Sequence, residues 1–413
     1  MLINLLRTLG IRVATAVISL LIVIVAGQML GAEVLGEISL LIVAVTIINL
    51  VGGFAGGAAL VYLIPRNSGT RLLPVSQSWA VLSGLLTAAV LYFIGAFPAN
   101  LVWHVLFLGI IGSLNQNLLS VLLANQRIKA HNLLTLLQSV LMICFLLGFT
   151  FLADIDSILA YVFSMYASYI PVLILSWMLA GRGKQIGQGS SSQALKILFG
   201  YGSLVQVSSI LALLTYRLTY YYTEAWLGLA ALGLLSVAAQ ISEAVWILPK
   251  SIALVQFSKI SNLKNDSDSA HLSFFLGTIT SVFTLLALAI LVFLPDQVYT
   301  FIFGSEFKGI SPVVRIFAPG IFAMSLNIIL SHYFSGTGRI LFNLAGSAIG
   351  LITVVITGFI FIRNGNLSNA AMVSTLGYAI NFLFAWLCFL WITRRERISI
   401  RKGFLVFRDM KTN

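Results

Sequence analysis

The amino-acid sequence predicts an all-α polytopic membrane protein, and three observations predict it: the composition, the length of the apolar segments and the placement of charge. Hydrophobic residues make up 59% of the 413 residues and charged residues only 9%, whereas about 25% of a soluble protein is charged. The mean hydropathy is +1.02. Because so few charges cannot cover the surface of a water-soluble chain, much of this surface must contact lipid.

Twelve apolar segments are long enough to cross a membrane as helices, which need about 20 residues each. None of them alternates between apolar and polar residues as the strands of a membrane barrel do. The predicted helices are approximately Val13–Leu30, Ile38–Ile64, Ser78–Phe97, Leu101–Ala124, Asn132–Leu152, Ile158–Leu179, Tyr201–Tyr222, Leu229–Ile252, Ser273–Leu294, Val314–Thr337, Phe342–Ile362 and Ser368–Thr393. Arg7 and Arg12 precede the first segment as in a signal peptide, but its length and the eleven segments that follow favour a retained helix.

Charge placement orients these helices. With the N-terminus in the cytoplasm, the inner segments hold 19 of the 24 basic residues, as the positive-inside rule requires. The outer segments hold only Lys308, Arg315 and Arg363. An even number of helices then places both termini in the cytoplasm. The net charge of +12 is therefore an orientation signal, and we expect no nucleic-acid partner.

An internal repeat relates the two halves of the chain. Leu-Gly pairs at 30–31 and 35–36, after the first predicted helix, align with Leu-Gly pairs at 227–228 and 232–233, after the seventh, at a constant offset of 197. A weaker echo aligns Gln126-Arg127-Ile128 with Gly338-Arg339-Ile340 at an offset of 212. Such repeats are typical of carriers.

The repeat and the charge pattern predict the domain organisation. We expect a six-helix lobe over residues 1–181, a cytoplasmic linker over 182–195, a second six-helix lobe over 196–393 and a basic cytoplasmic tail over 394–413. Six helices per lobe give the two lobes the same orientation. We therefore expect parallel lobes around a central cavity that holds the transport pathway.

Three stretches resemble a known family. The first is the Leu-Gly-x-x-x-Leu-Gly turn at 30–36. The second runs from Tyr216-Arg217 through the repeat of that turn to Glu243-Ala244-Val245-Trp246-Ile247-Leu248-Pro249. The third comprises Phe303-Gly304-Ser305-Glu306-Phe307, Gly336-Thr337-Gly338-Arg339 and Asn364-Gly365-Asn366. Over nearly the whole chain they resemble the Wzx-type oligosaccharide (O-antigen or capsule repeat unit) flippases. These belong to the polysaccharide transporter family of the multidrug/oligosaccharidyl-lipid/polysaccharide exporter superfamily.

The resemblance implies a multi-pass protein of the bacterial cytoplasmic (inner) membrane. It implies translocation of an undecaprenyl-diphosphate-linked oligosaccharide from the inner to the outer leaflet by alternating access, for lipopolysaccharide or other surface polysaccharide biosynthesis. The bilayer and a polysaccharide polymerase complex are the further partners it implies. Two features depart from the family pattern. Thr219 stands where many members have an acid, and the glycine-rich run 52–57 stands where many carry charge.

Two charged residues lie well inside predicted spans, where charge is costly and marks function by default. We interpret Arg217 as a substrate-binding residue for an anion, such as a diphosphate; a structural arginine that snorkels outward is the alternative. Glu243 is the ion-coupling candidate, and an interhelical hydrogen bond or a pair with Lys250 is the alternative. Helix rise places Arg217 and Glu243 at depths that differ by roughly 10 Å, which does not predict a direct pair.

Uncharged polar residues inside the spans are weaker candidates for lining the cavity. Those we select are Asn115, Asn117, Gln240, Asn327 and Asn381. Polar side chains in spans more often join helices, so packing is the favoured interpretation of each one. The glycines in 52–57 favour close packing or a hinge.

The sequence contains no phosphate-binding loop, paired carboxylates, metal-ligand spacing or nucleophile triad. We therefore expect a transporter rather than an enzyme, with no cofactor and no metal. A drug or cation antiporter of the same superfamily remains open, although it should carry more intramembrane acids. A membrane polysaccharide polymerase or ligase should carry a larger outer loop than 296–311, and a peptidoglycan-precursor flippase usually has two further helices.

Overall fold

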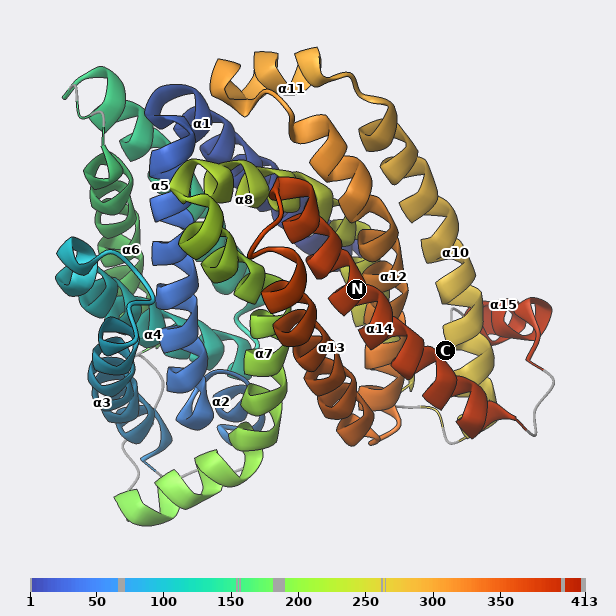
Figure 1. Ribbon diagram of the computed structural model, residues 1–413. Helices are drawn as coiled ribbons and strands as arrows, with labels where there is room; N and C mark the ends of the chain where they lie inside the picture. Colours follow the sequence, from blue (N-terminus) through green and yellow to red (C-terminus); the bar gives the residue numbers. More distant parts are fainter. Residues whose placement is uncertain are drawn as a thin grey trace. The chain divides into compact units, whose positions relative to one another are not determined.

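The computed structural model describes residues 2–65, 71–153, 155, 157–180, 190–260, 263, 265–394 and 398–409, and these described residues contain helices and no strand (Figure 1). The chain forms two compact units, Met1–Ile210 and Leu211–Asn413. The α-helices are α1 Leu2–Gly52, α2 Gly57–Leu63, α3 Leu72–Phe93, α4 Val102–Ala124, α5 Ile128–Phe151, α6 Ile158–Ala180, α7 Ser191–Leu227, α8 Leu229–Glu243, α9 Ile247–Ile260, α10 Asp266–Phe293, α11 Asp296–Phe303, α12 Ile310–Gly336, α13 Ile340–Phe361, α14 Leu367–Thr393 and α15 Ile400–Asp409.

Ten segments within the described residues are long and apolar enough to cross a membrane, or up to eleven with the bent α7. The expected polytopic all-α class is thereby confirmed. One of these segments, Val13–Leu63, has 51 residues and covers the first two predicted helices. At about 1.5 Å per residue it is more than twice as long as a hydrocarbon core of about 30 Å. Twelve crossings remain a prediction.

Two of the predicted helices are interrupted. The predicted helix Ile38–Ile64 breaks into the end of α1, a 3-10 turn at Gly53–Ala55 and α2. The predicted helix Leu229–Ile252 breaks into α8, a 3-10 turn at Ala244–Trp246 and α9. Both regions still belong to candidate spans, Val13–Leu63 and Leu229–Phe257. The interruptions add a local detail that hydropathy does not register, because it does not report a local loss of backbone hydrogen bonds.

The first unit is built around α4. This helix packs against α1, α3 and α6, and α1 also lies along α5 (Figure 1). Leu118, Val121 and Leu122 of α4 are buried with Val172 of α6. Faces turned away from the core carry large exposed apolar side chains, as on α3, where Leu86 is 59% and Phe93 84% exposed. Such faces suit lipid rather than water.

The second unit is built around α12, which packs against α8, α9, α10, α13 and α14. Tyr333 and Phe334 of α12, Phe389 of α14 and Ile260 of α9 form one buried cluster at one end of the unit. The outward faces of α10 and α13 are apolar and exposed, as at Ile290 and Ile360. A buried central helix within a ring of lipid-facing helices is the arrangement expected of a membrane lobe.

The internal repeat predicted from sequence has the same backbone conformation in both units. Gly31 has φ 80° and ψ 178° inside α1, and Gly228 has φ 89° and ψ 172° before α8. At the second echo, Gln126 has φ 57° and Gly338 has φ 75°. Arg127 and Arg339 then directly precede α5 and α13 with similar dihedrals, φ −84° and −97°. The aligned residues therefore form equivalent turns.

The boundary between the compact units falls inside α7, after Ile210. The linker expected over 182–195 and the lobes on either side of it stay a prediction. Residues 182–189 of that linker lie outside the described residues. The start of α7 belongs to the first unit because Ala194 and Leu198 are buried against Leu60 and Leu72. Between Gly200 and Gly202 the helix bends by 49°.

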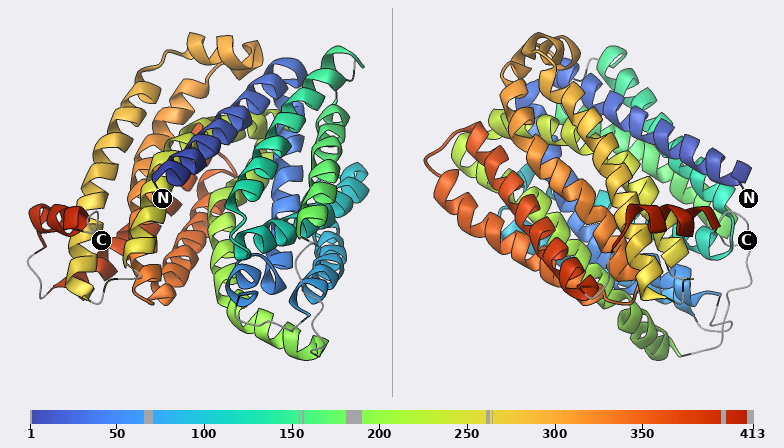
Figure 2. Two further views of the ribbon diagram at one scale, coloured as in Figure 1. Left: turned by 180° about the vertical axis from the view of Figure 1, so that it is seen from behind. Right: turned by 90° about the vertical axis from the view of Figure 1, so that its right-hand side faces the viewer.

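The described part of the basic tail contains a docked amphipathic helix, α15, that crosses the first turns of α10 (Figures 1 and 2). Phe404 and Phe407 contact the Phe275 ring of α10, and the Ser399 backbone N–H donates to His271 Nδ1 at 3.1 Å. Gly403 meets the backbone of His271 so closely that a Cβ would collide with it. Arg401 and Lys402 are exposed.

Candidate functional site

The two intramembrane charges selected from sequence form a bidentate ion pair in the second unit. Arg217 Nη1 lies 2.6 Å from Glu243 Oε1, and Nη2 lies 2.7 Å from Oε2. The side chains are 19% and 15% exposed. Paired, planar contacts of this kind are the strongest that Arg makes with a carboxylate. Each charge therefore compensates the cost of placing the other inside a span.

A direct pair did not follow from the depth estimate, which separated the two residues by roughly 10 Å along straight helices. The structure interrupts the helix of Glu243 directly after this residue, since α8 ends there and a 3-10 turn begins. Pro249 cannot donate to the carbonyl of Val245, which weakens helical bonding at this turn. Lys250, considered as a partner of Glu243, instead lies with Nζ 5.4 Å from the centroid of the Trp246 ring.

Aromatic rings surround the ion pair. Tyr216, Trp246 and Tyr378 contact one another, with ring centroids 5.4–5.8 Å apart. Arg217 lies over the Tyr220 ring at 5.1 Å. Trp246 is fixed by donation from Nε1 to the Ile321 carbonyl at 3.2 Å. Helices α7, α12 and α14 and the turn between α8 and α9 thus bring a cation, an acid and four rings together.

Thr219, which stands where many members of the resembled family have an acid, takes part in a buried contact between helices. Its hydroxyl lies 3.0 Å from the Ser374 hydroxyl, and both side chains are buried. A carboxylate in this position would face a hydroxyl of α14. The site therefore carries one acid, Glu243, rather than two.

Two of the five predicted polar candidates, Asn115 and Asn117, form hydrogen bonds with other helices. Asn115 donates to Gln138 Oε1 at 3.3 Å and accepts from the Ser176 hydroxyl at 3.2 Å. The remaining candidates are placed as follows: Asn117 accepts from the Gly57 N–H, Asn327 lies 3.5 Å from the Met324 sulfur, Asn381 packs against Gly346 and Gly350, and Gln240 is half-buried. None of the five contacts the Arg217–Glu243 pair through a hydrogen bond of the described residues.

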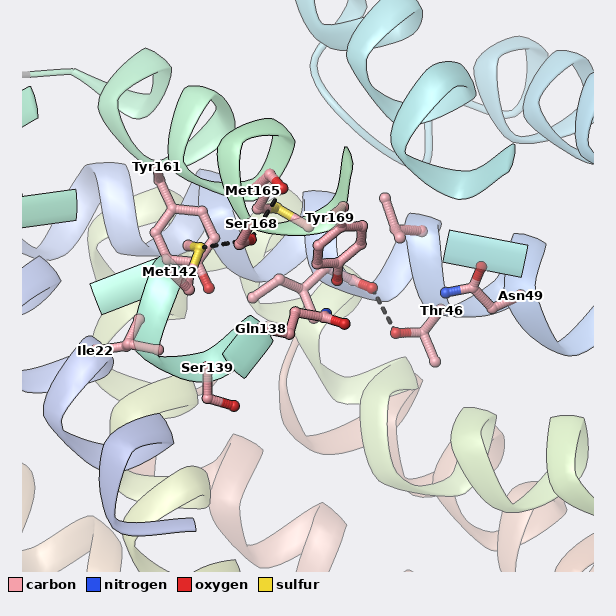
Figure 3. Close-up of a pocket in the computed structure, with 12 residues that line it drawn as sticks. Ile22, Thr46, Asn49, Gln138, Ser139, Met142, Tyr161, Met165, Ser168 and Tyr169 are labelled. Atoms are coloured by element: carbon pink, nitrogen blue, oxygen red, sulfur yellow. Dashed lines mark hydrogen bonds between the residues drawn. The ribbon is translucent and has the colours of Figure 1, made fainter. Parts of the chain in front are cut away.

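A second candidate site is a cavity of about 210 Å³ in the first unit, lined by α1, α5 and α6 (Figure 3). Its polar groups come from Thr46 and Asn49 of α1, Gln138 and Ser139 of α5, and Ser168 of α6, and Tyr161 and Tyr169 also line it. The lining holds no charged side chain. Figure 3 shows Tyr161 and Tyr169 on the α6 side, opposite Gln138.

The interrupted helix beside this unit's core is held by amide side chains. Gly56 is extended, with φ −146° and ψ −153°, and Gly57 has φ 48°. Asn117 Oδ1 accepts from the Gly57 N–H at 3.2 Å. A Cβ on Gly53 would lie 2.7 Å from Gln206 Nε2, and a Cβ on Gly56 would collide with Asn117. The glycine run therefore serves close packing around a helix break, which was one of the two interpretations of its sequence.

Sequence reasoning missed the aromatic residues of both sites. Aromatics are 12% of the chain, so Tyr216, Trp246 and Tyr378 carried no distinguishing signal. Thr46 and Asn49 could have been found, because they are polar residues three apart inside an apolar segment and therefore share a helix face. Among the described residues, no group of three His, Cys, Asp or Glu side chains could hold a metal ion.

The fold is similar to solved membrane transporters. No protein-family model matches the sequence, and no curated protein matches it. A multidrug resistance MATE family transporter of the MOP superfamily, in an inward-facing conformation, has a TM-score of 0.71 at 16% identity, with 94% of this chain and 98% of that chain covered. The lipid II flippase MurJ, in an inward closed conformation, has a TM-score of 0.72 at 16% identity, covering 96% and 89%.

A mutant of the Vibrio cholerae MATE transporter VcmN has a TM-score of 0.68 at 15% identity, covering 95% of this chain and 97% of that chain. Identities this low show the fold alone. The chain is a multi-pass membrane protein with the fold of MOP superfamily transporters.

Proposed function

We propose that this protein is a flippase. In this proposal it moves an undecaprenyl-diphosphate-linked oligosaccharide from the inner to the outer leaflet of the bacterial cytoplasmic membrane by alternating access. The observation that carries the proposal is the Arg217–Glu243 pair among aromatic rings inside a span. In this proposal the flippase serves the biosynthesis of surface polysaccharides, including O-antigen. A polymerase complex then uses the exported lipid-linked oligosaccharide. The MurJ and MATE folds support transport as the general activity.

Arg217 suits an anionic headgroup. Its guanidinium has five N–H donors, and Glu243 occupies two of them in the bidentate pair. A diphosphate would compete for the same donors, because Arg pairs with phosphate in the geometry it uses for carboxylate. Substrate binding would therefore exchange one anion for another at Arg217 and release Glu243, the group we assign to ion coupling.

The rings and amides around the pair suit sugars. Pyranose faces carry C–H groups that pack on aromatic rings, which present a negative face. Tyr216, Trp246 and Tyr378 supply such rings, and Gln240 lies less than one turn before Glu243 on α8. Asn115, Asn117 and Asn381 would act mainly by joining helices, since their contacts in the structure are to neighbouring helices, whereas Asn327 contacts Met324 of its own helix.

Transfer of a lipid-linked oligosaccharide in reconstituted vesicles tests the proposal. Wild type should move the lipid between leaflets, Arg217→Gln should stop transfer, and Arg217→Lys should reduce it because Lys cannot pair in a bidentate manner. Arg363→Gln is the control, since Arg363 is an exposed arginine beside the Phe359 ring. Unchanged transfer by Arg217→Gln would refute the assignment. The double variant Arg217→Gln/Glu243→Gln removes the unpaired acid and distinguishes misfolding from lost binding.

An ion-coupled drug antiporter is the second candidate, and the cavity of the first unit favours it. Tyr161, Tyr169, Met142 and Met165 line an uncharged space of about 210 Å³, which suits an organic cation through ring faces and soft sulfur. Uptake of a fluorescent monovalent cation into the same vesicles under a pH gradient tests this function. Cation uptake without lipid transfer would select the antiporter, and the reverse result would select the flippase.

A further inference from the structure

A basic hollow lies at one end of the second unit, away from the Arg217–Glu243 pair. It has a volume of about 410 Å³ and is lined by Arg339, Phe342, Trp391, Ile392 and Arg394. Arg339 directly precedes α13, and Arg394 directly follows α14. Two arginines next to different helices thus line one space, together with three apolar or aromatic side chains, at the ends of two candidate spans.

The charges of the hollow are only partly compensated. Arg339 Nη2 lies 2.8 Å from Asp266 Oδ2, and Asp266 is 64% exposed. Arg339 Nη1 also donates to the Tyr333 hydroxyl at 3.5 Å. Arg394 lies over the Trp391 ring at 5.7 Å, and no carboxylate of the described residues pairs with it. Two guanidinium groups against one exposed carboxylate leave the hollow positive.

The internal repeat shows that this arrangement differs from its equivalent in the first unit. Arg127, the counterpart of Arg339, donates from Nη1 to the Leu179 carbonyl at 2.9 Å and so closes the last turn of α6. Arg339 instead bonds to Asp266 and Tyr333 and borders the hollow together with Arg394. The repeat position thus caps a neighbouring helix in the first unit and borders the hollow in the second.

The surroundings of the hollow are those of a membrane interface. Trp391 is 61% exposed at the end of α14, and Trp beside Arg at the end of a span is typical of the headgroup region. Phe342 and Ile392 of the hollow and Val406 and Phe407 of α15 pack on the same buried cluster. α15 exposes Ile400 and Phe404 next to Arg401 and Lys402. An amphipathic helix with exposed apolar and basic groups lies in the plane of a membrane surface.

We propose that the hollow binds the phosphate headgroup of an anionic phospholipid from the surrounding bilayer. In this site Arg339 and Arg394 contact the phosphate, Trp391 and Ile392 contact the glycerol and upper acyl region, and α15 holds the adjoining surface through Arg401 and Lys402. Basic pockets between the ends of transmembrane helices are suited to such headgroups. The site is separate from the transport function proposed above and does not depend on it.

Lipid-dependent stabilisation of the purified full-length protein tests the site. We expect phosphatidylglycerol or cardiolipin, added to protein in neutral detergent, to raise the melting temperature, and phosphatidylcholine not to do so. Arg394→Gln and Arg339→Gln should each weaken the apparent affinity for anionic lipid about fivefold. Arg363→Gln is the matched control, since this exposed arginine lies over the Phe359 ring at 5.4 Å at the opposite end of α13, and it should keep the wild-type response.

Three results would overturn the proposal. Equal stabilisation by phosphatidylcholine and phosphatidylglycerol would show that the protein does not distinguish the charge of the headgroup. An unchanged response in both Arg394→Gln and Arg339→Gln would place the lipid elsewhere. Stabilisation by undecaprenyl diphosphate but not by anionic phospholipid, lost in the same variants, would make the occupant a transported lipid. Because Arg339→Gln removes the Asp266 pair, Arg394→Gln decides the matter if the first variant fails to fold.

Discussion

At the residue scale, the Arg217–Glu243 pair concentrates most of the charge chemistry of the second unit's interior. Both members were selected from sequence because charge inside an apolar segment is conspicuous. Their pairing could not be predicted, because it depends on how α7 and α8 are arranged in the folded chain. The aromatic neighbours could not be predicted either, since Tyr and Trp are common along the whole chain.

Removal of one member of the pair should destabilise the protein more than removal of both. Arg217→Gln or Glu243→Gln leaves an unpaired charge inside a span, at a cost of about 3–5 kcal/mol. The double variant leaves two neutral side chains that can hydrogen-bond and should recover a large part of that loss. Thermal unfolding in detergent, followed by the near-ultraviolet circular dichroism of the aromatic residues, gives the order of the three stabilities. Two single variants as stable as wild type would mean that solvent already screens the pair.

At the scale of elements, turns were more predictable than helix breaks. The turns at Gly31 and Gly228 were predicted as equivalent because a Leu-Gly pattern recurs, and they share their backbone dihedrals. The break at Gly53–Ala55 was expected only as one of two interpretations. A hydropathy scale counts its glycines as apolar residues and does not mark a break. The break depends on tertiary contacts, because Asn117 and Gln206 occupy the space that side chains would need.

The conformation at Gly228 predicts a specific cost for a side chain. At φ 89° an L-residue is strained, so Gly228→Ala should lower stability by about 1–2 kcal/mol although its Cβ would meet no atom within 4 Å. Gly277→Ala is the control, because Gly277 is helical and its Cβ would lie 4.0 Å from Ile329. That change should be neutral or stabilise by about 0.5–1 kcal/mol. Denaturant unfolding of both variants in detergent measures the difference, and equal effects would contradict the strain argument.

The docking of α15 depends on the absence of a side chain at Gly403. A Cβ there would collide with the His271 backbone and the Phe275 side chain, so Gly403→Val should release α15 from α10. Cleavage by trypsin at Arg401 or Lys402 should then become faster, while the transmembrane core resists as before. Leu405→Val, which introduces the same residue on the same helix at a half-buried position without adding bulk, is the control. Equal cleavage rates in both variants would mean that α15 does not need the close contact with α10.

At the scale of the whole molecule, composition alone determined the class, because a surface with 9% charge is compatible with lipid and not with water. Segment length and charge alternation went further and predicted a topology of twelve spans with both termini on one side. The predicted topology rests on the tendency of loops rich in Lys and Arg to stay in the cytoplasm. This tendency acts when the chain is inserted into a membrane. A single-helix error would invert every later segment, so reporters on either side of the chain's middle test the whole pattern.

Single cysteines in a Cys144→Ser/Cys388→Ser background provide those reporters. Lys129, Arg363 and Arg401 are exposed in the structure, and the charge pattern places Arg363 outside and the other two inside. An impermeant maleimide with access only to the outer face of the membrane should therefore label Arg363→Cys and spare Lys129→Cys and Arg401→Cys until the membrane is opened. Labelling of Arg401→Cys together with Arg363→Cys before opening would require an even number of spans between them. Labelling of Lys129→Cys and Arg401→Cys with protection of Arg363→Cys would show the reversed orientation. The basic loops would then lie on the outer side of the membrane, against the positive-inside rule.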